Sequence, residues 1–183
     1  TRAKVPMTKE EVRWVSVARL GVQPGDTVWD VGAGTGAVTF ELARKAMDGA
    51  VFAVERNTEA IELIAQNRQK LGGFNVHIVQ GHAPEVLADL PRPNCVFVGG
   101  SGGNMREIIE TALVKNPKAR IAVNAIALET LQETQRLFAE FGLQQVEITQ
   151  LSAARGKSIG CYTMMTANNP VFILSGKGDK YGE

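Results

Sequence analysis

Short apolar runs alternate with amphipathic segments through most of this chain, and that alternation restricts the folds it can adopt. The apolar runs, each about six residues long, predict strands at 27–32, 50–55, 75–80, 95–100 and 120–126. The intervening segments carry apolar residues at helical spacing and predict helices that start near residue 37 and at 58–71, 84–89, 105–115 and 128–141. Strands that are apolar throughout must be covered on both faces, so the pattern predicts an α/β fold with a parallel sheet between layers of helices.

The beginning of the chain predicts one further helix. Apolar residues recur at helical spacing over 8–20, Thr8 is suited to cap the first turn, and Glu11 completes a capping box. The chain begins without Met, as expected of a processed chain or of a domain taken from a longer protein.

The end of the chain departs from the alternating pattern. Strand-like segments at 143–151, 159–166 and 170–176 follow one another with no helix between them, and Asn168–Asn169–Pro170 marks a turn before the last. We therefore expect antiparallel strands over 143–176, after a nucleotide-binding core at 26–142. The segment 152–158 is expected to be a flexible loop. With no repeat or linker, the chain is expected to form one domain, 1–183.

Composition and charge exclude several classes of protein. Hydrophobic residues make up 44% and charged residues 21%, which is typical of a globular protein. The net charge of +1 gives no overall field that favours nucleic acid or an anionic membrane. The sequence has neither an apolar run of the roughly 20 residues that span a bilayer nor a secretory signal. Cys95 and Cys161 are far apart and form no C-x-x-C pair, which favours reduced thiols in a cytoplasmic protein. We also expect no bound metal, membrane or nucleic acid.

A glycine-rich loop, Gly32-x-Gly34-x-Gly36, lies between the first predicted strand and its helix. In an open α/β sheet, ligands bind beyond the carboxyl ends of the strands, where this loop is placed. Glycines let the chain turn sharply and let a ligand contact the backbone, whereas a purely structural turn needs only one or two of them. The loop therefore predicts a nucleotide site.

The spacing of this loop leaves two ligands open. Gly32-x-Gly34-x-x-Ala37 satisfies the relaxed fingerprint of dinucleotide-binding proteins. Glu55 ends the second strand, where a carboxylate can accept hydrogen bonds from both ribose hydroxyls. NAD and S-adenosylmethionine both contain this ribose, so Glu55 suits either one. The alternative for Glu55 is a solvated charge at the end of a strand.

Asp30 distinguishes between the two ligands. It lies inside the first strand, where dinucleotide-binding folds carry an apolar residue. A buried carboxylate costs free energy unless it is hydrogen-bonded. We expect it to bind amides of the glycine loop and the ammonium group of a methionine moiety, whereas it would repel a pyrophosphate. The order Asp30-x-Gly32-x-Gly34-x-Gly36 resembles motif I of the class I S-adenosylmethionine-dependent methyltransferases.

Two later loops fit that resemblance. "QGHAPEVL" (80–87) follows the third strand, where the class I fold binds adenine, and the Ala83 N–H is placed to bind a ring nitrogen. These enzymes often carry Asp at the position of His82. A neutral His82 can accept a hydrogen bond from the exocyclic amine, and a lone surface histidine is the equal alternative.

The loop "VGGSGGNM" (98–105) follows the fourth strand, where the methyl acceptor is expected. It lacks the Asn/Asp-Pro-Pro-aromatic motif of the methyltransferases that act on adenine amines in DNA and RNA. Its four glycines would admit a broad acceptor lying against backbone. A plain glycine turn, with Asn104 and Glu107 as a cap-like pair for the next helix, is the alternative.

Four segments, 6–43, 81–87, 96–110 and 123–130, are similar to the decarboxylating precorrin carbon-15 methyltransferases of cobalamin biosynthesis, and the similarity extends from residue 6 to residue 176. The resemblance implies a Rossmann-like class I fold, with a mostly parallel seven-stranded sheet and antiparallel C-terminal strands. It implies methyl transfer from S-adenosylmethionine to a precorrin-6 or cobalt-precorrin-6 intermediate, with loss of a ring acetate carboxyl group. It also implies a homotetramer and, in some organisms, fusion behind a second methyltransferase domain.

The resemblance also implies two groups of binding residues. The cofactor-binding group comprises Thr8, Asp30, Gly32, Ala33, Gly34, Thr35, Gly36, Glu55, Arg56, Gly81, His82, Ala83 and Gly99. The acceptor carries several carboxylates, so cations are expected around it, and the acceptor-binding group comprises Arg13, Gly100, Ser101, Gly102, Gly103, Arg106, Asn124, Arg155 and Lys157. A solvated surface charge is the alternative for each cation, and a turn role is the alternative for Asn124. No catalytic acid or base is assigned.

Three other functions remain open at this point. An NAD-linked dehydrogenase is supported only by the relaxed fingerprint. A methyltransferase that acts on tRNA or protein would share motif I, although the near-neutral charge and the 6% of aromatic residues disfavour nucleic acid. A non-catalytic subunit that binds S-adenosylmethionine would bind the ligand without turnover.

Overall fold

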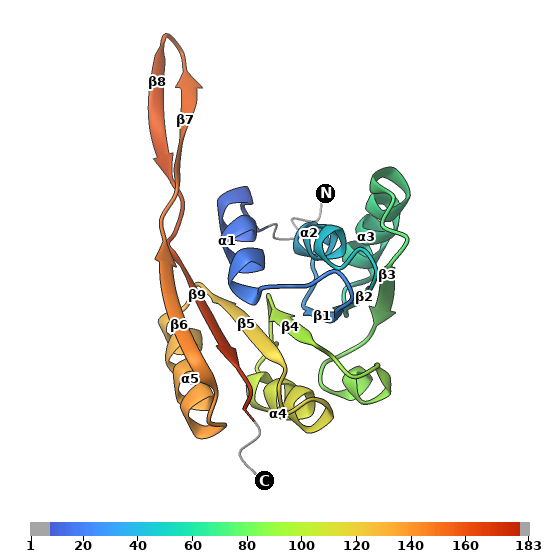
Figure 1. Ribbon diagram of the computed structural model, residues 1–183. Coiled ribbons are helices and arrows are strands. Elements are labelled where there is room, and N and C mark those ends of the chain that lie inside the picture. Colours follow the sequence, from blue (N-terminus) through green and yellow to red (C-terminus); the bar gives the residue numbers. More distant parts are fainter. Residues whose placement is uncertain (1–7, 180–183) are drawn as a thin grey trace.

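The computed structural model describes residues 8–179, and a seven-stranded sheet runs through its centre (Figure 1). Its strands are β1 (Thr27–Val31), β2 (Ala50–Glu55), β3 (Val76–Gln80), β4 (Cys95–Val98), β5 (Arg120–Ala125), β6 (Gln144–Leu151) and β9 (Val171–Lys177). Their order in the sheet is β3-β2-β1-β4-β5-β9-β6. Strands β1 to β5 are parallel, and β9 is antiparallel to both β5 and β6. The expected mostly parallel seven-stranded sheet is confirmed, with one reversed strand.

The other two C-terminal strands leave this sheet. β7 (Ala154–Ile159) and β8 (Tyr162–Ala167) pair only with each other and project from the body as a hairpin (Figure 1). The expectation of a flexible loop over 152–158 is therefore wrong, because most of that segment forms β7. The pairing is regular from Ala154 with Ala167 to Ile159 with Tyr162, and Gly160 at a φ of +61° makes the turn. The segment 159–166 extends this hairpin and adds no strand to the main sheet.

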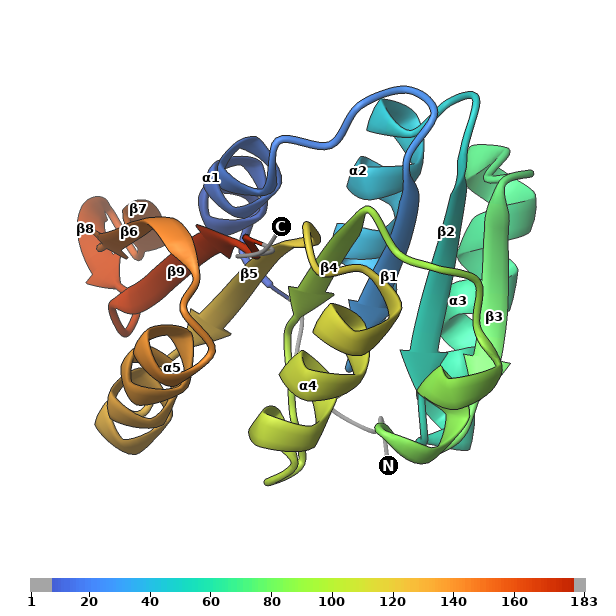
Figure 2. The same cartoon turned by 60° about the horizontal axis from the view of Figure 1, so that its bottom comes forward.

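Helices cover both faces of the sheet (Figure 2). One layer contains α1 (Glu10–Leu20), α2 (Ala37–Lys45) and α3 (Thr58–Leu71), and the other contains α4 (Met105–Lys115) and α5 (Leu128–Glu140). A short 3-10 helix, Glu85–Asp89, precedes β4. No helix within residues 8–179 is long and apolar enough to cross a membrane.

The start of α1 differs from its expected capping box. The helix begins at Glu10, with Lys9 at the N-cap and no side-chain capping hydrogen bond. The Thr8 carbonyl accepts a hydrogen bond from the Arg13 guanidinium at 2.8 Å. The Glu11 carboxylate binds Arg155 of the hairpin, so a contact that is distant in sequence replaces the local cap.

Alternation along β1 assigns its side chains to two separate cores. Trp29 packs into the core on the α4–α5 side, whereas Val28 packs into the core on the α1–α3 side. Asp30 follows Val28 by two positions and therefore faces α2. Every position of β1 from Val28 to Val31 is paired with both β2 and β4. A carboxylate thus lies in the middle of the sheet, just before the strand ends.

Candidate functional site

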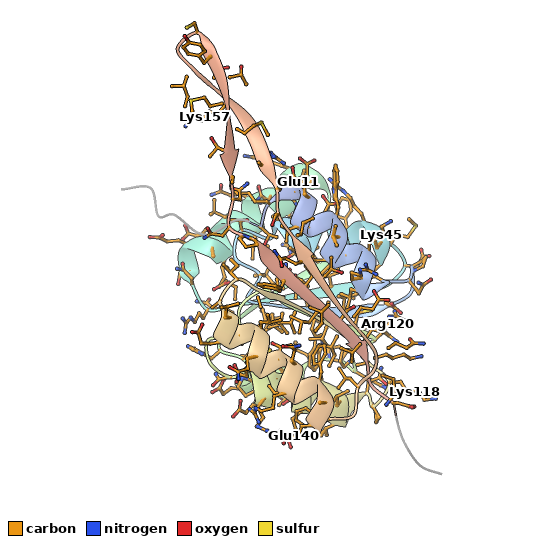
Figure 3. The ribbon with its side chains drawn as sticks, turned by 90° about the vertical axis from the view of Figure 1, so that its left-hand side faces the viewer. Glu11, Lys45, Lys118, Arg120, Glu140 and Lys157 are labelled. Atoms are coloured by element: carbon orange, nitrogen blue, oxygen red, sulfur yellow. The ribbon has the colours of Figure 1, made fainter. Side chains whose placement is uncertain are left out.

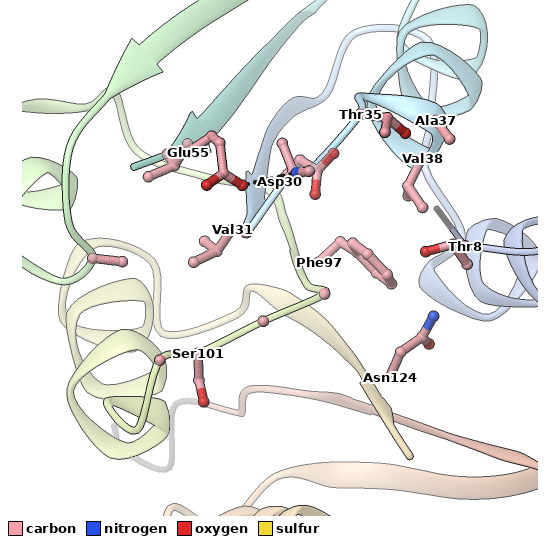
Figure 4. Close-up of a pocket in the computed structure, with 18 of the residues that line it drawn as sticks. Thr8, Asp30, Val31, Thr35, Ala37, Val38, Glu55, Phe97, Ser101 and Asn124 are labelled. Carbon is pink, nitrogen blue, oxygen red and sulfur yellow. Dashed lines mark hydrogen bonds between the residues drawn. The ribbon is translucent and has the colours of Figure 1, made fainter. Parts of the chain in front are cut away.

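A cavity of about 530 Å³ opens at the carboxyl ends of β1, β2, β4 and β5 (Figure 4). Sixteen residues expected to bind ligand line it, namely Thr8, Asp30, Gly32, Ala33, Gly34, Thr35, Glu55, Arg56, Gly81, His82, Ala83, Gly99, Gly100, Ser101, Gly102 and Asn124. The structure therefore gathers most of the two expected groups around one cavity. Six expected residues lie outside its lining, namely Gly36, Arg13, Gly103, Arg106, Arg155 and Lys157.

Two glycines of the first loop are required by the protein itself. Gly32 has a φ of +75°, and a Cβ there would lie 2.6 Å from the Gly100 carbonyl oxygen. Gly36 has a φ of +78°, and its Cβ would lie 3.0 Å from the Phe40 ring and 3.1 Å from Ile64. The backbone that approaches Gly32 so closely is thus the second glycine loop. Gly36 packs against the helix layer, which explains why it does not line the cavity.

Asp30 is fully buried and only half satisfied. The Thr39 hydroxyl of α2 donates to Oδ2, whereas Oδ1 has no hydrogen-bond partner among the described residues. The expectation that loop amides bind Asp30 is wrong, because the Gly34 N–H donates to Glu55 at 2.9 Å. Burial raises the pKa of Asp30 to about 7, the Thr39 hydrogen bond opposes this rise, and the charge of Glu55 adds to it.

A second buried polar atom without a partner among the described residues lies in the glycine loop that follows β1. Thr35 Oγ1 has no partner among residues 8–179, and Thr35, like Asp30, lines the cavity (Figure 4). Buried polar atoms are rarely left unsatisfied, and each one costs free energy until a partner arrives. Because Asp30 Oδ1 is a carboxylate oxygen, the donor that suits it best is a cation. The residues present therefore fit a ligand with an ammonium group at this end of the cavity.

Glu55 is held in place by three backbone N–H groups. Oε1 accepts from Arg56 and Asn57, and Oε2 accepts from Gly34, all at 2.9 Å. A carboxylate offers about four acceptor sites, so one remains on Oε2. We expected each Glu55 oxygen to accept a hydrogen bond from a ribose hydroxyl. Oε1 can do so only if it loses its hydrogen bond from the N–H of Arg56 or Asn57.

The third loop differs from expectation at His82. The Arg56 guanidinium lies 3.3 Å from His82 Nε2. Arginine can only donate, so Nε2 is the acceptor and the proton of a neutral ring lies on Nδ1. His82 is thus already engaged where it was expected to accept from an exocyclic amine. Asn104 precedes α4 as expected but makes no capping hydrogen bond, and its Nδ2 donates to the Ala83 carbonyl at 2.9 Å.

The four expected acceptor cations lie outside the cavity lining, and three of them have partners elsewhere. Arg13 binds the Thr8 carbonyl, and Arg106 pairs with Glu140 at 2.5 Å on the α4–α5 side. Arg155 pairs with Glu10 and Glu11, and Lys157 lies on the projecting hairpin (Figure 3). Local sequence gave no indication of the partners of Arg106 and Arg155, because these contacts join elements that are distant in the chain.

Sequence reasoning also missed part of the cavity wall. The additional lining residues are Lys9, Val12, Val31, Ala37, Val38, Val54, Phe97, Ile126, Asn168, Asn169 and Val171. Asn168 and Asn169 were interpreted only as a turn, and their amides were the one available signal. Ser16 was also missed: it is buried in α1, with its hydroxyl 2.9 Å from Asn124 Oδ1 at the end of β5. Asn124 thus faces the cavity instead of making a turn.

The strand order with β9 reversed, the glycine loop after β1 and the acid at the end of β2 together define a class I S-adenosylmethionine-dependent methyltransferase. The chain belongs to the precorrin methyltransferase domain family, whose model matches residues 2–177.

Individual relatives agree with this assignment. The chain is 42% identical over 173 residues to a probable cobalt-precorrin-6B C(15)-methyltransferase (decarboxylating) from Pyrobaculum calidifontis, which covers 93% of this chain and 88% of that one. The crystal structure of a precorrin-6y C5,15-methyltransferase from Geobacter metallireducens has a TM-score of 0.89 at 36% identity, over 97% of this chain and 92% of that one. A precorrin 8w decarboxylase from Methanobacterium thermoautotrophicum has a TM-score of 0.87 at 40% identity, over 94% and 92% of the two chains.

The contact between the two glycine loops yields a prediction about stability. Gly32→Ala should lower the free energy of unfolding by at least about 2 kcal/mol, because the new Cβ adds strain at positive φ and collides with backbone. Gly100→Ala is the matched control: a Cβ there meets nothing within 4 Å, so stability should stay within about 0.5 kcal/mol of wild type. Urea denaturation measures both, and equal effects at the two positions would contradict this packing.

The burial of Asp30 yields a prediction about pH. Its folded pKa of about 7 exceeds the ordinary value of 3.8, so the folded state binds more protons and the Asp30 contribution to stability falls as pH rises between these values. Relative to wild type, Asp30→Asn should therefore be more stabilising at pH 8 than at pH 5, by roughly 2 to 3 kcal/mol. Urea denaturation at both pH values tests this, with the exposed Asp48→Asn as control. A pH-independent difference would show that Asp30 is ionised in the fold throughout.

Proposed function

We propose that the protein transfers a methyl group from S-adenosylmethionine to carbon-15 of a precorrin-6 or cobalt-precorrin-6 intermediate, with loss of carbon dioxide from a ring acetate. The observation that carries the proposal is the make-up of this cavity: a half-satisfied buried carboxylate, Asp30, in its wall and a glycine-lined mouth. The names of the 34–42% identical relatives specify the acceptor and the carbon.

The deep end of the cavity suits the cofactor. Asp30 Oδ1 would accept from the ligand ammonium, and the remaining site on Glu55 Oε2 from a ribose hydroxyl. The Ala83 N–H, in the loop that Asn104 ties to α4, would bind adenine. When bound, S-adenosylmethionine supplies an electrophilic methyl group on a sulfonium. The role of these residues is to fix that methyl relative to the acceptor.

The mouth of the cavity suits a broad, flat acceptor. The backbone from Gly99 to Gly102 forms one wall, and Ile126 and Val171 add apolar surface. The acceptor is an electron-rich ring carbon, so transfer needs no strong base from the protein. Holding the two reactants in line can contribute roughly 7–11 kcal/mol to lowering the barrier. In the step that releases carbon dioxide, the macrocycle itself acts as the electron sink.

The projecting hairpin supports assembly into a homo-oligomer, and we assign the tetramer expected of the family. Ile159, Tyr162 and Met164 lie on one face of the hairpin and are 51%, 71% and 55% exposed. A two-stranded hairpin is marginally stable alone in water, and an exposed apolar face favours packing against another surface.

The proposed cofactor site predicts ligand binding that is coupled to proton release. S-adenosylhomocysteine should bind the wild type, and Glu55→Ala should weaken binding at least tenfold, because a charge-assisted acceptor is lost. At pH 6 the ligand ammonium should displace a proton from Asp30, whereas at pH 8 little proton remains to be displaced. Calorimetry in buffers of different ionisation enthalpy measures this release.

A ligand that lacks the amino group is the control for this coupling. 5′-Methylthioadenosine should bind without releasing a proton, and Asp30→Asn should abolish the release that accompanies S-adenosylhomocysteine. Equal proton release with both ligands would contradict the assignment of Asp30. Failure of the wild type to bind S-adenosylhomocysteine would overturn the proposed function.

The reaction itself is tested by product mass. Incubation with a precorrin-6 intermediate and S-adenosylmethionine should give a product that has gained one methyl and lost one carbon dioxide. Binding without turnover would instead identify a non-catalytic subunit, and methylation without loss of carbon dioxide would reject the decarboxylating assignment.

The hairpin predicts the state of association. Tyr162→Ser combined with Met164→Ser should shift the protein to smaller species in sedimentation velocity, because the apolar hairpin face is lost. Met47→Ser, an exposed apolar residue remote from the hairpin, is the control. An unchanged sedimentation coefficient in the double variant would contradict assembly through this face.

A further inference from the structure

The mouth of the cavity carries a cation that the sequence did not suggest. Lys9 lines the cavity, is exposed, and makes no ion pair with any residue in 8–179. The other charged lining residues are the buried Asp30, the half-buried Glu55 and Arg56, which contacts His82. Lys9 is therefore the charged side chain placed to meet an anionic acceptor on the α1 side of the mouth.

Two carboxylates directly follow Lys9 in the first turn of α1. Glu10 and Glu11 would cancel its charge if they were free. Arg155 binds both of them from strand β7, at 2.6 Å to Glu11 Oε1 and 3.3 Å to Glu10 Oε2, and its Nε lies 2.9 Å from Glu11 Oε1. Figure 3 shows Glu11 at the end of α1 that meets the base of the hairpin. A side chain 144 positions away from Glu11 is thus the partner of both carboxylates that follow Lys9.

We propose that Lys9 and Arg155 determine specificity for a carboxylate-bearing acceptor: Arg155 neutralises Glu10 and Glu11, so that Lys9 presents its positive charge to the acceptor. The inference rests on the proposed function, because it concerns the acceptor of that same reaction. It gives Arg155 a positioning role without contact with the acceptor, and it makes Lys9 a binding residue.

The charges around the mouth support this arrangement. Arg155 pairs with Glu10 and Glu11, the charge of Arg13 also acts on Glu11, and Lys9 precedes both carboxylates in sequence, so this region holds three cations and two carboxylates. Without Arg155 the cations and carboxylates balance, and both carboxylates lose their guanidinium partner. Exposed charges interact weakly, so each change should alter acceptor affinity by about fivefold. The change in acceptor affinity should appear in KM for the acceptor, with kcat unchanged.

The proposal predicts a division between kinetic constants. Lys9→Met and Arg155→Gln should each raise KM for the precorrin-6 acceptor about fivefold, with kcat and the affinity for S-adenosylhomocysteine unchanged. The increase should shrink as salt rises from about 0.05 M to 0.5 M, because screening weakens exposed charges. Lys45→Met is the matched control, since this exposed lysine ends α2 outside the cavity lining, and the KM of that variant should equal the wild-type KM.

A further variant separates charge from mechanical support. If Arg155 acts by neutralising carboxylates, adding Glu10→Gln and Glu11→Gln to Arg155→Gln should restore KM, although no ion pair is rebuilt. If Arg155 only braces the hairpin against α1, this triple variant should remain as impaired as Arg155→Gln alone. The second result overturns the proposal for Arg155.

The outcomes also separate this inference from the function on which it rests. Normal turnover by wild type, with KM unchanged in both Lys9→Met and Arg155→Gln, overturns the inference and leaves the proposed function intact. A wild-type protein that binds S-adenosylhomocysteine but turns over no precorrin-6 acceptor overturns the proposed function, and the inference falls with it. Raised KM in both single variants and recovery in the triple variant support the proposal.

Discussion

A carboxylate buried in the central strand of the sheet is the constraint on which the site depends. Asp30 is paired through its backbone with β2 on one side and β4 on the other, so it cannot move away from the core. Thr39 satisfies one of its oxygens, and the other remains unpartnered in the cavity wall. Folding therefore retains an unfavourable group, and a cationic donor offsets that cost when it binds. Asp30 thus represents a compromise between stability and function.

The close contact of two glycine loops relates the cofactor end of the cavity to the acceptor end. Gly32 lies against the backbone of Gly100, so the loop after β1 and the loop after β4 have a fixed separation. Methyl transfer requires donor and acceptor to be in line, and a small displacement is costly in rate. Backbone contact provides this alignment without dependence on side-chain rotamers. Gly32 is thus needed for packing between the two loops, whatever it also contributes to ligand binding.

Most of the fold and the core of the site could be predicted from sequence, because both arise from local patterns. The apolar runs gave β1 to β5, and the loops that follow β1, β2, β3 and β4 supply 12 of the 27 residues that line the cavity. What failed were contacts between distant elements. Arg155 was assigned to the acceptor, yet it binds the first turn of α1; His82 was expected to be available, yet Arg56 occupies its Nε2. The side chain of Lys9 carries no pattern, and only packing of α1 beside the sheet brings it to the mouth.

The most direct test of the central claim is a crystal structure of the protein grown with both S-adenosylhomocysteine and NAD. The account predicts that S-adenosylhomocysteine occupies the cavity, with its ammonium within hydrogen-bond distance of Asp30 Oδ1 and a ribose hydroxyl on Glu55. A pyrophosphate lying across residues 32–36, or an ammonium directed away from Asp30, would contradict it.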